Sequence, residues 1–302
     1  MKTNRIRQNV LPLLAAFIWG TAFVAQSVGA DYVEPFTFNA ARSAVAFLFL
    51  LVLCLILRAV RKGSGAPAAQ TASRRELITA GVCCGAALTV ASYFQQKGLE
   101  TTTSGKAGFI TALYIVIVPI VGVFLKKKAP RTIWLGVALA VAGLYCLCIT
   151  EEFRITTGDF YILLCAFCFS GHILIIDHFS QKVDGVEMSC VQFLVAAVLS
   201  CIGMLLWESP DWEALWLCIG PILYAGILSS GVAYTLQILA QKDSDPTVVS
   251  LLLSLESVFA TLSGAIILGD RMSGKEYFGC LLMFAAVILA QLPDKRGEAA
   301  LR

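Results

Sequence analysis

The sequence predicts an all-α integral membrane protein with ten transmembrane helices. Three features lead to this fold class: the composition, a series of long apolar runs and an internal repeat. Of the 302 residues, 58% are apolar and only 14% are charged, whereas a soluble globular protein carries about 25% charged residues. A chain this apolar cannot cover its surface with polar groups, so a single soluble domain is excluded.

Ten apolar runs have the length that a helix needs to cross a bilayer, about 20 residues. They cover residues 10–28, 36–57, 77–96, 105–125, 133–149, 160–179, 186–207, 215–240, 248–269 and 277–292. The remaining residues form short loops and tails, which leaves no room for a soluble catalytic or nucleotide-binding domain. The chain also lacks a GxxxxGK[ST] phosphate loop, so ATP-driven transport by this chain alone is not expected.

The basic residues predict the orientation. Most of the 23 Lys and Arg residues lie at the N-terminus, in the polar stretch 58–75, after the fourth run and at the C-terminus. Since cytoplasmic loops are enriched in Lys and Arg, both termini are predicted to be cytoplasmic, in the plasma membrane of a bacterium. The net charge of +3 is too small to indicate a nucleic acid partner.

An internal repeat divides the chain into two halves. An offset of 150 residues sets Ala16–Gly20 over Ala166–Ser170 and Arg42 over Gln192. The fifth and tenth runs also match, with Trp-Leu-Gly at 134–136 and Tyr-Phe-Gly at 277–279.

The predicted repeats are residues 1–153 and 154–302. Each holds five helices, and an odd number means that the second repeat enters the membrane in the opposite sense. Inverted repeats of this kind place a substrate site between the halves near the bilayer midplane and support alternating access.

Several motifs of the chain are typical of one known family: Ile18-Trp19-Gly20-Thr21-Ala22-Phe23, Pro35-Phe36, Arg42, Pro119, Leu255-Glu256 and Leu268-Gly269-Asp270. On these residues the chain resembles the EamA-type transporters of the drug/metabolite transporter superfamily. The chain departs from the family pattern at Ser257, where Pro is frequent, and at Asp270, where Glu is frequent. Near the corresponding end in the first half it has Lys126–Lys128 instead of Gly-Glu. The resemblance implies a ten-helix exporter or exchanger of small metabolites that uses no cofactor.

Few ionisable residues lie inside the spans, where a charge is costly and therefore suggests function. Glu256 is the candidate coupling residue, because a carboxyl group in apolar surroundings can hold a proton in one state and release it in another. Alternatively Glu256 is structural, either through a hydrogen bond in the bundle or through pairing with Arg42. Arg42 and Pro119 are assigned structural or gating roles.

Polar and aromatic side chains within the spans are the candidates for substrate binding. They are Trp19, Thr21, Gln96, Tyr114, His172, Tyr234, Gln237 and Glu256. Tyr234 and Gln237 share one helix face and can line a pocket for a zwitterion or a flat polar ligand, or form interhelical hydrogen bonds instead. We expect Trp19, Tyr234 and Gln237 to border one central cavity.

A metal site is not expected. Cys165, Cys168 and His172 share one helix face, but a single helix supplies no fourth ligand, and structural zinc is almost always four-coordinate. Core packing explains these side chains better. All 11 cysteines lie in apolar runs, where thiols behave as small hydrophobes.

The leading functional prediction is a secondary transporter of small metabolites such as amino acids or amphipathic compounds, with protons as the candidate coupling ion. One alternative is an intramembrane enzyme, which needs paired reactive groups at membrane depth; the chain has no HExxH, and Asp177-His178 falls at a cytoplasmic helix end. The other is a scaffold or channel subunit, for which an inverted repeat is unnecessary. The sequence does not distinguish a monomer from a homodimer.

Overall fold

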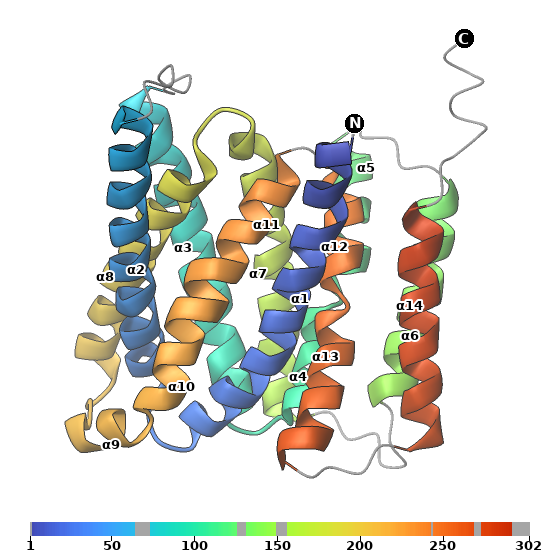
Figure 1. Cartoon of the computed structure of the whole chain (residues 1–302). Helices are drawn as coiled ribbons and strands as arrows, with labels where there is room; N and C mark the ends of the chain where they lie inside the picture. The colour runs from blue at the N-terminus through green and yellow to red at the C-terminus, as the bar shows by residue number, and fades with distance from the viewer. Residues whose placement is uncertain are drawn as a thin grey trace.

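The computed structural model is a bundle of helices that run along one common direction (Figure 1). It describes residues 2–63, 73–125, 131–148, 156–242, 244–268 and 273–291, and every regular element in these ranges is a helix. The elements are α1 (Lys2–Ala30), α2 (Pro35–Gly63), α3 (Arg74–Leu99), α4 (Ser104–Thr111), α5 (Tyr114–Phe124), α6 (Arg131–Cys148), α7 (Thr157–Ser180), α8 (Gly185–Trp207), α9 (Trp212–Leu217), α10 (Ile219–Leu223), the π-helix η1 (Tyr224–Ala233), α11 (Tyr234–Gln241), α12 (Pro246–Leu253), α13 (Glu256–Ser263), the π-helix η2 (Gly264–Leu268) and α14 (Gly274–Gln291).

The described chain contains eight helical segments that are long and apolar enough to cross a membrane. They are Gln8–Ala30, Pro35–Gly63, Arg74–Leu99, Ser104–Phe124, Thr157–Ser180, Gly185–Trp207, Ile219–Gln241 and Pro246–Ile267. The fifth and tenth predicted spans correspond to α6 and α14, whose apolar stretches, Thr132–Cys146 and Tyr277–Leu289, are shorter. These two helices pack against each other at one side of the bundle (Figure 1). Eight spans are therefore supported, and the ten-span count stays a prediction.

Side-chain caps explain where several helices begin. Thr156 and Asp159 form a reciprocal capping box at the start of α7, which satisfies backbone N–H groups that have no partner within the helix. Asp184 accepts hydrogen bonds from two backbone N–H groups at the start of α8. Asp245 caps α12, and Pro246 follows at the first helical position, where its missing N–H costs nothing.

The fourth and ninth predicted spans, expected as continuous helices, are interrupted in the middle. Between α4 and α5 the backbone tightens, with Leu113 N–H donating to the Ile110 oxygen at 3.2 Å. Between α12 and α13, Leu255 N–H donates to the Leu252 oxygen at 3.3 Å. At this second interruption the Ser254 hydroxyl also donates to the backbone oxygen of Leu251 at 2.7 Å, a contact that bends helices.

The eighth predicted span is also irregular, because ten of its residues form the π-helix η1. This element packs closely against α2: a Cβ atom at Gly226 would lie 2.7 Å from the Cβ of Val45 and 2.9 Å from the Arg42 backbone oxygen. Only glycine allows the two backbones to approach so closely. Extended π-helical segments are rare and occur frequently at functional sites.

Helix packing follows the same scheme in both halves of the described chain. Two pairs join equivalent helices of the two halves: α2 packs on α8, and α6 packs on α14. The contact of α3 with α7 corresponds to the contact of the η1–α11 segment with α1. The start of α1 and the end of α14 lie at the same end of the bundle, which we call the inner end; the opposite end is the outer end (Figure 1). This arrangement fits an inverted repeat. The predicted repeat boundary at 153/154, much of the 58–75 linker, Lys126–Lys128 and Gly269-Asp270 lie outside the described residues.

Candidate functional site

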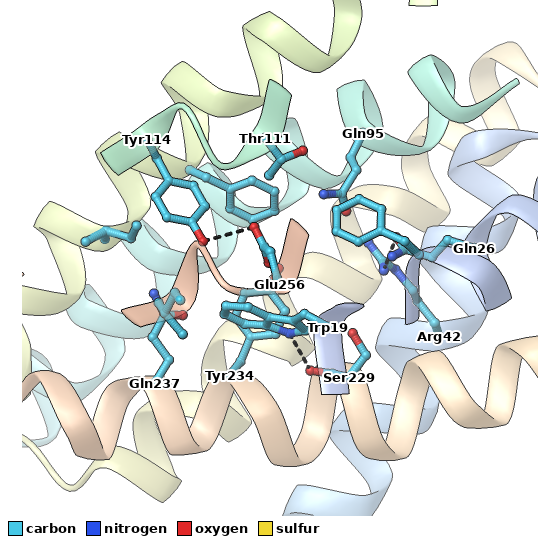
Figure 2. A pocket seen from close by; sticks show the side chains of 14 residues that line it. Trp19, Gln26, Arg42, Gln95, Thr111, Tyr114, Ser229, Tyr234, Gln237 and Glu256 are labelled. Atoms are coloured by element: carbon cyan, nitrogen blue, oxygen red, sulfur yellow. Dashed lines mark hydrogen bonds between the residues drawn. The ribbon is translucent and has the colours of Figure 1, made fainter. Parts of the chain in front are cut away.

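A narrow cavity lies at the centre of the bundle, between the two halves (Figure 2). Its volume of about 30 Å³ accommodates about two water molecules and no metabolite. Its lining comes from both halves: Trp19, Phe23, Gln26, Arg42, Gln95, Thr111, Tyr114, Phe169, Ile173, Ser229, Tyr234, Gln237, Leu253 and Glu256. We refer to this arrangement, in which the polar centre has little free volume, as the closed state.

Aromatic rings form one wall of the cavity. The rings of Trp19 and Tyr234 lie 4.7 Å apart between centroids, and Phe169 lies 6.4 Å from Tyr234. The indole N–H of Trp19 donates to the backbone oxygen of Ser229 in η1 at 3.2 Å (Figure 2). This hydrogen bond fixes the indole of α1 against the π-helix.

Glu256 supplies the only carboxylate among the lining residues. It is the first residue of α13 and is 3% exposed. The interruption of the ninth span thus places the carboxylate at a helix N-terminus, where the backbone N–H groups favour negative charge. The Tyr114 hydroxyl donates to Glu256 Oε1 at 2.9 Å (Figure 2).

Glycine brings α1 next to this carboxylate. A Cβ atom at Gly20 would lie 2.3 Å from the Phe259 Cβ and 2.8 Å from the backbone oxygen of Glu256. The absence of a side chain at Gly20 therefore allows α1 to pack directly on α13, beside Trp19.

Arg42 supplies the positive charge of the cavity and is 4% exposed. Its guanidinium donates to Gln26 Oε1 at 2.9 Å and lies 5.8 Å from the centre of the Phe38 ring. Within the described ranges, neither Arg42 nor Glu256 takes part in an ion pair. The structure thus does not pair Arg42 with Glu256, although the sequence left that pairing open.

Several residues that line the cavity occupy equivalent positions in the two repeats. Tyr114 and Glu256 are 142 positions apart and each is the first residue after a helix interruption. The same offset relates Gln95 to Gln237, and the offset of 150 relates Trp19 to Phe169. The hydrogen bond between Tyr114 and Glu256 therefore joins two equivalent positions of the halves.

Four predicted residues lie away from this cavity lining. Thr21 shares a hydrogen bond with the Tyr224 hydroxyl, and Gln96 donates to the backbone oxygen of Gln26 at 2.9 Å. His172 is fully buried behind Tyr234, with Nε2 3.2 Å from Gln192 Oε1. Pro119 is buried within α5. The other predicted binding residues, Trp19, Tyr114, Tyr234, Gln237 and Glu256, line the cavity together with Arg42.

The assignment from sequence missed several lining residues. The polar ones are Gln26, Gln95, Thr111 and Ser229. Gln95, not the adjacent Gln96, faces the cavity, and the offset of 142 that relates it to Gln237 becomes apparent only with the contact between Tyr114 and Glu256. No group of three His, Cys, Asp or Glu side chains in the described ranges is arranged to hold a metal ion.

Comparison with known proteins now identifies the family. A family model described as the EamA-like transporter family matches the chain twice, at residues 8–149 and 156–292. The chain belongs to the EamA-like transporter family. This confirms the resemblance seen in the sequence and its place in the drug/metabolite transporter superfamily.

Relatives of this EamA-like chain carry the same general description. A protein of Archaeoglobus fulgidus named an uncharacterized transporter is 30% identical over 280 residues, which cover 92% of this chain and 84% of the relative. The uncharacterized transporter YwfM of Bacillus subtilis is 26% identical over 299 residues, 95% of each chain. The EamA-like chain is thus a membrane transporter, a class distinct from enzymes.

A solved crystal structure has the same fold as this EamA-like chain. It aligns with a TM-score of 0.75 and covers 96% of this chain and 98% of its own length. At 19% identity the likeness establishes the fold alone.

Proposed function

We propose that this EamA-like protein is a secondary transporter, an exporter or exchanger of small zwitterionic metabolites such as amino acids, in a bacterial plasma membrane. The two repeats, 1–153 and 154–302, would alternate access to the central cavity. The observation that carries the proposal is that two buried side chains of opposite charge, Arg42 and Glu256, line one cavity without forming an ion pair. A buried charge is costly unless it is paired, and a ligand with both charges would pair each of them.

Arg42 is suited to the carboxylate of the ligand. A guanidinium presents its N–H donors in a planar fork that matches a carboxylate. In the closed state Arg42 donates to the neutral amide of Gln26, a weaker partner that a carboxylate can replace.

Glu256 is suited to the ammonium group. Its hydrogen bond comes from the neutral phenol of Tyr114, which an ammonium can displace. The nearby rings of Trp19 and Tyr234 add to this preference, because aromatic faces attract cations.

The size of the cavity supports a cycle with an occluded state. Its volume of about 30 Å³ requires side chains or helices to move before a metabolite enters. If Glu256 holds a proton in the empty cavity and releases it when an ammonium binds, one positive charge leaves as another enters, which is a simple basis for proton exchange.

Thermal unfolding of the purified protein tests the proposal. The ligands are phenylalanine, leucine and threonine, each compared with its methyl ester, which lacks the carboxylate, and with its deaminated acid. A bound zwitterion should raise the melting temperature by mass action, whereas the two truncated forms should not.

Arg42→Gln and Glu256→Gln should each abolish the shift, and Lys97→Gln, at an exposed ion pair, should preserve it. Equal shifts from amino acids and from their esters would contradict the proposal.

A further inference from the structure

A polar face of α11 leads from the cavity towards the inner end. Tyr234, Gln237 and Gln241 are spaced i, i+3 and i+7, so they lie on one side of the helix. Tyr234 and Gln237 line the cavity, and Gln241 is the last residue of α11. The Gln241 amide donates to the backbone oxygen of Ile173 in α7 at 2.8 Å, which shows that this face is turned towards α7.

His172 and Gln192 lie beside the same face. The His172 ring is fully buried, and its centre lies 5.8 Å from the centre of the Tyr234 ring, which it meets edge-on. Its Nε2 lies 3.2 Å from Oε1 of Gln192, from α8. Since an amide oxygen only accepts, His172 Nε2 is the donor, and its Nδ1 is an acceptor.

Four buried polar atoms of this region have no hydrogen-bond partner within the described part of the chain: Gln237 Oε1, Gln241 Oε1, His172 Nδ1 and Gln192 Nε2. Nearly all buried polar atoms in proteins are hydrogen-bonded, so a cluster of four calls for a partner. Three of the four are acceptors. The missing partner is therefore a group that donates hydrogen bonds, such as water, a hydroxyl or an ammonium.

The first half repeats this polar face only in part, since Gln95 and Arg42 stand at the positions equivalent to Gln237 and Gln192. At the position equivalent to Gln241 it has Leu99, and at the position equivalent to His172 it has Ala22, both apolar. The acceptors of His172 and Gln241 thus have no polar counterpart in the first half, so the repeat alone does not account for them.

We propose that the interface of α11 with α7 and α8, where the buried side chains of His172, Gln192, Gln237 and Gln241 lie, opens as the inner passage of the transporter and conducts ammonium or hydroxyl groups between the cavity and the inner end. The inference rests on the proposed transport function. Tyr234 lines the cavity and meets the His172 ring edge-on, so its movement would open the passage to the cavity.

Thiol labelling tests the passage without a known substrate. Gln241→Cys is prepared in the otherwise unchanged chain, and modification at each cysteine is followed by mass spectrometry of peptides. The probes are cationic 2-aminoethyl methanethiosulfonate and anionic 2-sulfonatoethyl methanethiosulfonate. We expect labelling at position 241 from the inner side of oriented vesicles, at least tenfold faster with the cationic reagent after correction for the intrinsic reactivity of each reagent.

Ile238→Cys is the matched control. Ile238 is on the same helix and fully buried, but it packs in an apolar cluster with Ala80, Ile176 and Met188, so it should stay unlabelled. Equal labelling at 238 and 241, absence of labelling at 241, or a preference for the anionic reagent would overturn the proposal.

A second measurement avoids substitution inside the passage. The chain has only two histidines, so in His178→Gln every carbethoxylated histidine is His172. A hydrated passage predicts slow, complete modification of His172 by diethylpyrocarbonate in the folded protein, whereas a sealed core predicts none until unfolding. Neither readout requires transport. If the passage is accessible but no zwitterion binds, the proposed substrate fails while the passage stands.

Discussion

Glu256 and Tyr114 form the shortest connection between the two halves at the cavity, with 2.9 Å between the phenol and the carboxylate oxygen. Glu256→Gln keeps the size of the side chain and removes its charge. We expect it to abolish transport of ammonium-bearing substrates, or at least the dependence of transport on pH, and to leave the folded protein intact. Counterflow in liposomes between pH 5 and 8, with the amino acid that gives the largest thermal shift, measures this.

The control for this substitution is Glu213→Gln, because Glu213 is exposed and lies outside the cavity. It should transport as the unchanged protein does. Normal transport by Glu256→Gln with an unchanged pH profile would assign Glu256 a packing role.

Tyr114→Phe removes the phenol hydroxyl and keeps the ring. The loss of this hydrogen bond should lower the free energy of unfolding by about 1 kcal/mol. Because the phenol and the substrate ammonium compete for the same carboxylate, the variant should bind the zwitterion more tightly, with a Kd about fivefold lower, the equivalent of about 1 kcal/mol. Isothermal titration calorimetry measures the Kd; an unchanged or raised Kd would show that Tyr114 is not displaced by substrate.

At the residue scale, the sequence identified the charged and aromatic centre of the cavity better than its periphery. Glu256 and Arg42 stand out because charges inside spans are rare. The choice between Gln95 and Gln96 depends on how α3 is rotated about its axis, and hydropathy says little about rotation in a helix buried on several sides. His172 illustrates the same limit, since its ring lies behind Tyr234.

At the scale of elements, apolar runs predicted where helices lie but not where they are interrupted. The tight turns at 112–113 and 254–255 replace some α-helical hydrogen bonds with shorter-range ones, without any change in hydropathy. Neither interruption falls at a proline: Pro119 lies within α5. The π-helix η1, which packs closely against α2, is likewise invisible in composition.

The contact of α1 with α13 gives a prediction for an element. Gly20→Ala would place a methyl group 2.3 Å from the Phe259 Cβ and 2.8 Å from backbone atoms of α13, so the two helices must separate. We expect loss of at least tenfold in zwitterion affinity, measured by calorimetry, with the helix content unchanged by circular dichroism.

Gly171→Ala is the matched control, because nothing lies within 4 Å of a Cβ atom at Gly171 in α7. The higher helix propensity of alanine should stabilise this variant by up to about 1 kcal/mol without affecting affinity. Equal effects of the two substitutions would mean that helix flexibility, rather than the contact between α1 and α13, governs binding.

At the scale of the whole molecule, polar contacts hold the α2–α8 pair at both ends. At the inner end Arg58 pairs with Glu187 at 2.8 Å. At the outer end the Glu208 carboxylate accepts from the backbone N–H groups of Phe36 and Thr37, each at 2.7 Å. A pair of helices fixed at both ends is a poor candidate for movement, so alternating access would rely on helices that line the cavity, α1 and α7 and the interrupted spans.

The inverted arrangement also predicts the topology of the protein. The end of α2 and the start of α1 lie at the inner end, whereas the connection between α8 and α9 lies at the outer end (Figure 1). The distribution of Lys and Arg predicts that the inner end is cytoplasmic. Cysteines introduced at Gly65 and at the exposed Ser209 should therefore react with an impermeant maleimide from opposite sides of the membrane, Gly65 only in inside-out vesicles and Ser209 only in right-side-out ones. Labelling of both positions from one side would show that α2 and α8 do not cross the membrane in opposite directions. It would thereby exclude the inverted repeat on which the shared cavity depends.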